Sequence, residues 1–154
     1  MTKRVGDLIT KRVGDLMTTE SSTVSEDMAI YEAVKKIAAR PRGKIACVVD
    51  KEGKLKGLLT PRDILEALEV RRFGVFRGRF FAGPEVLHLL TSKYAKDIMS
   101  APVSVHVNDG IREAINTMID HGFYELPVVD EKMRVIGEIG YSEILLNAVE
   151  NQKT

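Results

Sequence analysis

Two copies of one sequence unit run through the chain, and this duplication constrains the fold more than any other feature. Five short anchors recur in the same order, each displaced by 80 to 82 residues. They are positions 15–17 and 97–99, 30–34 and 111–115, 48–50 and 128–130, 57 and 137, and 64–65 and 144–145. Repetition at a near-constant spacing is the signature of a repeated structural unit. We therefore interpret the chain as an internal duplication.

Each copy predicts the same succession of elements. Apolar residues at i, i+3, i+4, i+7 and i+8 from Ile30 to Ala38, and again from Ile111 to Ile119, predict one amphipathic helix per copy. Short apolar runs over 45–49 and 55–59 around a turn at 50–53, repeated over 126–129 and 135–139, predict β-hairpins. A closing helix is predicted over 61–72 and over 141–150. With a short strand in front, each copy is a β-α-β-β-α unit of the α/β (α+β) class.

Size and composition narrow the setting of these units. A unit of about 55 residues buries too little apolar surface to be robust alone, so we expect the copies to pair by a pseudo-twofold axis, leaving clefts that suit ligands. Cys47 is the only cysteine, which excludes an internal disulfide and suits a cytoplasmic protein. The near-zero net charge of +1 gives no general reason to expect nucleic acid, and no apolar run predicts membrane insertion.

The motifs resemble those of the CBS domain, named after cystathionine β-synthase. The resemblance is carried by four segments: Asp-Leu-Met-Thr at 15–18, Val-Val-Asp at 48–50, Gly-Leu-Leu-Thr-Pro-Arg-Asp at 57–63 and Leu-Pro-Val-Val-Asp at 126–130. It implies a tandem CBS domain pair, with a first domain over 11–70 and a second over 94–150. A duplicated N-terminal segment (1–10) and an Arg/Phe-rich linker (71–93) lie outside them. It also implies a regulatory module, often a homodimer, that binds adenosine-containing ligands (AMP, ADP, ATP or S-adenosylmethionine) and acts on an unknown protein partner.

Thr60 and Asp63 are the first candidate site residues. Thr60 is a preferred N-cap, Pro61 suits the first helical position, and an acid at the third position complements the helix dipole, so capping alone explains them. A helix N-terminus can also receive a phosphate. By resemblance, Thr60 adds a hydroxyl donor and Asp63 accepts hydrogen bonds from the ribose hydroxyls.

The resemblance adds further residues to this ligand site: Leu58, Lys44, Arg62, Val103, Val105, Tyr124, Glu125 and Pro127. A glutamate at position 125 would repel a phosphate chain unless Lys44 or Arg62 neutralises it, so AMP is the preferred ligand. The alternative to a binding role is that Lys44 and Glu125 only flank β-strands and are exposed to solvent. Gly140 and Glu143 stand where the first copy has Thr60 and Asp63, and we expect a weaker second site there.

Two segments fall outside the repeat. Residues 71–84 hold four arginines and four phenylalanines. This segment could pack on the module or a dimer interface, dock a partner or fold over the ligand, or, as the least favoured alternative, bind single-stranded nucleic acid. Residues 2–8 are repeated unchanged at 10–16. The second of these is in register with 92–98, which predicts that it packs and that the first is surplus.

The sequence as a whole predicts a sensor and not an enzyme. No catalytic nucleophile with its base, metal-ligand spacing or glycine-rich phosphate loop is present, and no obligatory cofactor is expected. His88, His106 and His121 are scattered, and Cys47 is expected in the core. The alternative function is a ligand-independent, dimeric interaction platform that recruits a partner through the Arg/Phe-rich linker.

Overall fold

The computed structural model describes residues 10–40, 45–73 and 84–150. Within these residues the chain forms two compact units. One unit is Ser22–Pro102, and the other combines the residues before position 22 with those from Val103 onward. Each unit contains one three-stranded sheet.

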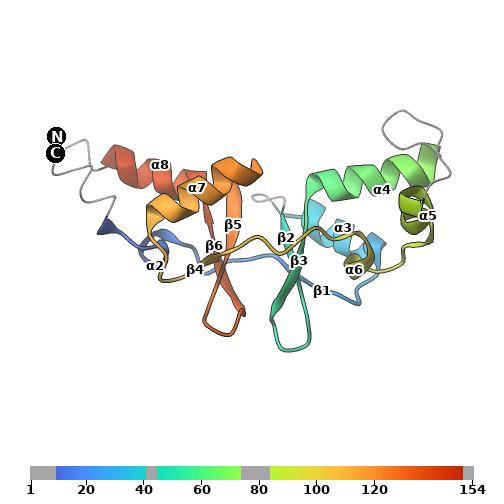
Figure 1. The fold of residues 1–154 in the computed structure, drawn as a ribbon, viewed down its shortest axis with the longest axis horizontal. Coiled ribbons are helices and arrows are strands. Elements are labelled where there is room, and N and C mark those ends of the chain that lie inside the picture. Colours follow the sequence, from blue (N-terminus) through green and yellow to red (C-terminus); the bar gives the residue numbers. More distant parts are fainter. Residues whose placement is uncertain (1–9, 41–44, 74–83, 151–154) are drawn as a thin grey trace. The chain divides into compact units, whose positions relative to one another are not determined.

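The unit Ser22–Pro102 contains the first predicted β-α-β-β-α succession. Its elements are β1 (Thr23–Ser25), α3 (Ile30–Ala38), β2 (Ala46–Val49), β3 (Leu55–Leu59), α4 (Pro61–Phe73), α5 (Pro84–Thr91) and α6 (Ala95–Ile98). The sheet order is β1-β2-β3, with β1 parallel and β3 antiparallel to β2. Figure 1 shows α5 beside the C-terminal end of α4. The sequence pattern did not predict α5.

The other unit repeats this succession. Its elements are α2 (Val13–Leu16), β4 (Val105–His106), α7 (Ile111–His121), β5 (Glu125–Val129), β6 (Val135–Gly140) and α8 (Tyr141–Glu150). The sheet order is β4-β5-β6, again parallel and then antiparallel. The α+β class and the order of elements predicted for each copy are confirmed.

The predicted helix stripes supply the two cores, with one correction. Ile30, Ala33 and Ile37 of α3 are buried with sheet residues in one apolar cluster, and the matching residues of α7 are buried in another. The last member of each predicted stripe, Ala38 and Ile119, is exposed instead. Position i+8 lies about 80° around the helix from position i, so these side chains have already turned away from the sheet.

The start of each copy pairs with a strand of the other copy. Thr18, near the start of the first copy, pairs with Glu138 on β6 through both backbone hydrogen bonds (2.9 and 3.0 Å). Ser100, near the start of the second copy, pairs in the same way with Leu58 on β3 (2.8 and 3.0 Å). We call residues 17–18 and 99–100 the crossing segments. The sequence repeat runs from 15 and from 97, whereas each compact unit combines parts of both copies.

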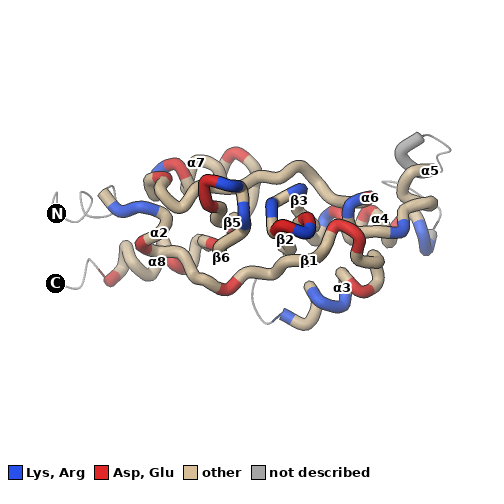
Figure 2. The backbone as a smooth tube through the Cα atoms, turned by 90° about the horizontal axis from the view of Figure 1, so that it is seen from below, with Lys and Arg blue, Asp and Glu red and all other residues tan. Residues whose placement is uncertain are grey.

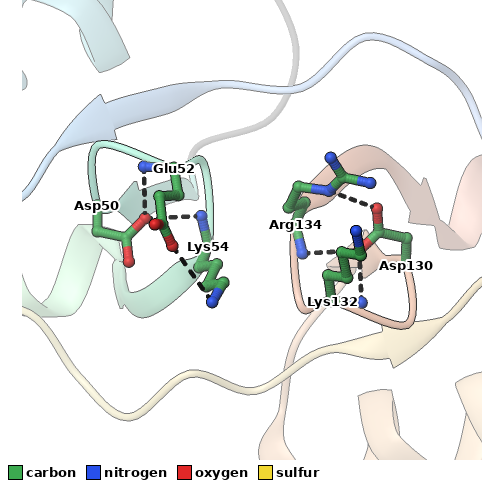
Figure 3. Close-up of polar contacts among 6 residues, drawn as sticks. All are labelled: Asp50, Glu52, Lys54, Asp130, Lys132 and Arg134. Carbon is green, nitrogen blue, oxygen red and sulfur yellow. Dashed lines mark hydrogen bonds and ion pairs between the residues drawn. The ribbon is translucent and has the colours of Figure 1, made fainter.

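The two hairpin turns are built around equivalent aspartates, as Figure 3 shows. Oδ1 of Asp50 accepts the N–H groups of Glu52 (2.9 Å) and Lys54 (3.0 Å), and Asp130 accepts those of Lys132 and Arg134 at the same distances. The Lys54 N–H is the main reason that the pKa of Asp50 is lowered. Burial acts to raise the pKa of Asp130, but the hydrogen bonds from Arg134 and Lys132 and the charge of Arg134 together outweigh it and the pKa is lowered.

Candidate functional site

Thr60 and Asp63 form a reciprocal cap on the first turn of α4. The Thr60 N–H donates to Asp63 Oδ2 at 2.8 Å, and the Asp63 N–H donates to Thr60 Oγ1 at 3.2 Å. The Thr60 hydroxyl also donates to Asp63 Oδ2 at 2.7 Å. This is a capping box, because each side chain satisfies a backbone donor of the other residue. The predicted capping role is confirmed.

The crossing segment adds a third residue, Ser100, to this cap. Its hydroxyl donates to Asp63 Oδ1 at 2.5 Å. Thr60 is buried, Asp63 is half-buried and Ser100 is exposed, so the carboxylate lies at the surface with one oxygen fixed from each side. Ser100 was not among the site residues predicted from the sequence. Its position directly after Asp97-Ile98-Met99, matching Thr18 after the first copy of this motif, was the signal that could have found it.

Three other residues of the first copy were predicted to contact the ligand, and their surroundings differ. Arg62 is exposed and pairs with Glu66 at 3.0 Å, one helical turn further along α4. The Leu58 side chain is fully buried, and the Leu58 N–H and C=O both bond to Ser100. These bonds hold Ser100 beside the cap. Lys44 lies outside the described residues. The ligand contacts of all three stay predictions.

The equivalent position in the other unit is built differently. The Gly140 N–H donates to Glu143 Oε2 at 2.9 Å, so the longer acid caps α8 without a hydroxyl partner from position 140. Thr18, the counterpart of Ser100, donates its hydroxyl to the Glu20 carbonyl at 3.3 Å instead. The rings of Tyr124 and Tyr141, both exposed, make an edge-to-face contact at 5.8 Å beside this cap.

The remaining predicted residues belong to the unit that contains β4–β6. Val105 and Pro127 are buried, Val103 is half-buried against the apolar cluster, and Glu125 is half-buried at the start of β5. Their predicted contribution to the ligand site that contains Asp63 stays a prediction.

The Arg/Phe-rich segment is described only at its edges. Arg71 donates to the carbonyl of Leu89 (3.5 Å) and to that of Ser92, and these bonds tie α4 to the end of α5. Residues 74–83, and with them the predicted dimer, partner and nucleic-acid contacts of this segment, lie outside the described residues.

Charges on the described residues are mixed, as Figure 2 shows. Along α3, for example, Glu32 lies in the first turn, and Lys35 and Lys36 lie in the last turn, which complements the helix dipole. Over the same residues no group of three or more His, Cys, Asp or Glu could hold a metal ion. Cys47 is buried in β2, as predicted. None of the helices described is both long and apolar enough to span a bilayer.

Comparison with known proteins decides the family. The family model for the CBS domain matches residues 13–70 and 95–150. The chain belongs to the CBS domain family. The recognition drawn from the sequence motifs is therefore confirmed, and the two matches cover both copies of the repeat.

The curated relatives of the chain differ in length. The chain is 30% identical over 136 residues to the CBS domain-containing protein YhcV of Bacillus subtilis, covering 88% of this chain and 84% of that protein. It is 32% identical over 107 residues, 69% of the chain, to an uncharacterised 33.4 kDa protein of Thermofilum pendens, of which it spans only 35%. Of an L-aspartate semialdehyde sulfurtransferase from Methanocaldococcus jannaschii it spans 12%, at 38% identity over 38% of this chain.

Solved structures share the fold of a CBS pair. A CBS domain-containing protein of Thermotoga maritima is 31% identical with a TM-score of 0.70, covering 88% of this chain and 92% of that one. CBSX2 in complex with AMP gives a TM-score of 0.72 at 19% identity, covering 92% and 98%. The CBS pair of MJ0100, in complex with 5′-methylthioadenosine and S-adenosylmethionine, gives 0.68 at 22% identity, covering 94% and 98%.

Proposed function

We propose that this chain is a regulatory module that binds an adenosine-containing ligand, with the Asp63 carboxylate as the ribose acceptor. The observation that carries the proposal is the fixed orientation of Asp63. Both carboxylate oxygens are held, one by Thr60 and one by Ser100, while the group remains at the surface. A carboxylate offers about four lone-pair sites, and the two Thr60 donors and the Ser100 hydroxyl use three of them. The fourth can accept one hydroxyl of a vicinal diol.

The ligand class draws support from the family. CBS domain pairs are generally regulatory modules, and two proteins of the same fold are known in complex with AMP and with S-adenosylmethionine and 5′-methylthioadenosine. All three ligands carry an adenosine group with a ribose, and differ at the 5′ position. An acceptor for ribose hydroxyls therefore suits the part that they share.

We favour AMP over ligands with longer phosphate chains. Arg62 is the one cation on the first turn of α4, and its guanidinium is already paired with Glu66. Diverting this group to a phosphate would break the pair, although an exposed pair of this kind contributes little, about 0.3–0.5 kcal/mol. One such cation suits a single phosphate better than three.

Calorimetry with Asp63→Asn tests the proposal. Asparagine keeps an acceptor for the cap but loses the charge that strengthens a hydrogen bond from a ribose hydroxyl, so we expect AMP affinity to fall at least about tenfold. Asp15→Asn is the matched control: Asp15 caps α2 by accepting the Arg12 N–H at 2.8 Å and lies in the other unit. It should leave AMP affinity unchanged. If the wild-type chain binds none of AMP, ADP, ATP and S-adenosylmethionine, the proposal is wrong.

Transmission of the ligand signal is the second part of the proposal. The ligand would act by binding one arrangement of a homodimer or partner complex more tightly than another, because equal affinity shifts no equilibrium. The homodimer, the protein partner and the cytoplasmic setting stay predictions. The alternative platform function stays one too, because residues 74–83 of the Arg/Phe-rich linker (71–93) that it uses lie outside the described residues.

A further inference from the structure

We propose that Ser100 is a specificity-determining residue of the Asp63 site, and that it makes this site select ligands with an intact ribose diol. The inference rests on the proposed function and deepens it. Ser100 lies near the start of the second copy, 37 residues after Asp63, and its hydroxyl donates to Asp63 Oδ1 at 2.5 Å.

The backbone of Ser100 is held where this contact requires it. Its N–H and C=O both bond to Leu58, two residues before Thr60. The crossing segment can lie this close to β3 because Gly57 has no side chain: a Cβ there would be 2.6 Å from the Ser100 carbonyl oxygen. The backbone of Ser100, and with it the Cβ that carries the hydroxyl, is therefore positioned by the sheet.

The second unit provides an internal comparison. Thr18 makes the same two backbone bonds to Glu138, and Gly137 provides the same close approach. The Thr18 hydroxyl nevertheless donates to the Glu20 carbonyl, and Glu143 is bonded to Gly140. The scaffold is thus common to both units, while the contact between the crossing-segment hydroxyl and the acid is described in the first only. The same backbone pairing therefore does not by itself produce the contact between Ser100 and Asp63.

The chemistry of the contact explains selectivity. A serine hydroxyl has one proton, and Ser100 gives it to Asp63 Oδ1, so its own two lone pairs remain as acceptors. Asp63 and Ser100 together then present acceptors held in one geometry. A ligand with both ribose hydroxyls can satisfy them by donating, whereas a deoxy ligand leaves an oriented acceptor without a donor. Without Ser100 the carboxylate is held on one side only and adapts more easily to a deoxy ligand.

The test compares AMP with 2′-deoxy-AMP and 3′-deoxy-AMP by calorimetry. We expect Ser100→Ala to weaken AMP about tenfold and the weaker of the two deoxy ligands by about twofold or less, so that discrimination falls about fivefold. Ser100→Thr, which keeps the hydroxyl, should restore it. Thr18→Ala is the matched control and should change neither affinity nor discrimination. Thermal unfolding of each variant checks that it is folded.

The outcomes separate this inference from the proposed function. If AMP binding depends on Asp63 but Ser100→Ala keeps the wild-type ratio of AMP to deoxy-AMP affinity, the role of Ser100 is wrong and the function stands. An equal loss for all three ligands also overturns the role, because Ser100 then supports the cap without selecting the diol. If wild-type protein binds no adenosine ligand, both fail.

Discussion

The Thr18 carbonyl oxygen lies so close to the Gly137 backbone that a Cβ atom on residue 137 would be 2.1 Å from it. This approach allows the paired hydrogen bonds between Thr18 and Glu138. The glycine belongs to β6 in the second copy, and the threonine lies near the start of the first copy. The absence of a side chain at Gly137 therefore allows the start of the first copy to pair with the last strand of the second copy.

Gly137→Ala should destabilise the protein by about 3 kcal/mol or more, because the obstacle is a backbone carbonyl that cannot move without breaking the bridge. Chemical denaturation measures this directly. Gly110→Ala is the control, since a Cβ there has no atom within 4 Å. It should cost less than about 1 kcal/mol, as expected of a change at an N-cap. Equal effects of the two substitutions would contradict the close-approach argument.

The two hairpin turns differ in how well their sequence suits their backbone. Gly53 has φ of 82°, and Met133, at the matching position of the second copy, has φ of 62°. The left-handed region disfavours residues with a Cβ by about 1–2 kcal/mol. Met133→Gly should therefore raise the free energy of unfolding by about 1 kcal/mol, reduced somewhat by the flexibility that glycine gives the unfolded chain.

The reciprocal substitution is the control for this turn. Gly53→Met should lower the free energy of unfolding by a similar amount, because it places the disfavoured side chain in the first hairpin. Urea midpoints of both variants can be compared with the wild-type value. Two changes of the same sign would show that the side chain at these positions acts through something other than backbone conformation.

Asp97 should make stability depend on pH. The N–H groups of Lys93 and Tyr94 donate to Oδ2, at 3.0 and 2.9 Å, and lower the pKa of this carboxyl below its usual value of 3.8. A carboxyl whose pKa is lowered by folding stabilises the folded state fully above the unfolded pKa, and this contribution is lost as pH falls towards the folded pKa. The window is therefore below about pH 4.

Asp97→Asn isolates this effect. Asparagine can accept the same N–H groups but does not titrate. The variant should therefore lose less free energy of unfolding than wild type as the pH falls below about 4. Urea unfolding at a series of pH values gives the comparison. Asp27→Asn, which removes the partner of Lys96 (2.8 Å) and not the acceptor of the α6 cap, should leave the Asp97 contribution in place. Identical acid profiles for Asp97→Asn and wild type would refute the cap as its source.

Hydrophobic periodicity predicted the helix and the hairpin of each unit because their core residues follow a local pattern, whereas Val13, Ala95 and Ile98 join the cores from distant segments. The stripe from Ile30 to Ile37 and the hairpin runs are local signals, and the structure confirmed them. The crossing segments were assigned to their own copies, because a four-residue helix such as α6 has no measurable period and its partner is chosen by tertiary packing. Ser100 was missed for the same reason, because its contact with Asp63 depends on the backbone pairing between Ser100 and Leu58, which is a tertiary contact.

The capped Thr60–Asp63 pair was predicted because its signal is local, a threonine, a proline and an acid within four residues. Local signals cannot say which distant groups complete a site. They do show where the copies differ, since Gly140 and Glu143 replace this pair in the second copy, and that difference makes the number of ligand sites testable.

A transplant of the cap should create a second site. Gly140→Thr with Glu143→Asp copies the first cap into α8, and the backbone allows it: a Cβ at 140 would meet Glu143 Oε2 at 2.9 Å, which the shorter acid removes, and the Tyr124 carbonyl at an ordinary 3.4 Å. Calorimetry with AMP should show a single site per wild-type chain and a second, weaker site in the double variant. The second is expected to be weaker because the Thr18 hydroxyl donates to Glu20 and does not orient the new acid.

Glu143→Gln is the control for the transplant. It keeps an acceptor for the Gly140 N–H, so the cap of α8 should persist, and AMP binding at the Asp63 site should be unchanged. If wild-type chains already bind AMP at two equal sites, and Glu143→Gln removes one of them, the longer acid is sufficient for ribose and the asymmetry between the copies has no functional consequence. A stoichiometry unchanged by the transplant would instead show that a hydroxyl and a short acid at the helix start do not make a site without the crossing-segment hydroxyl.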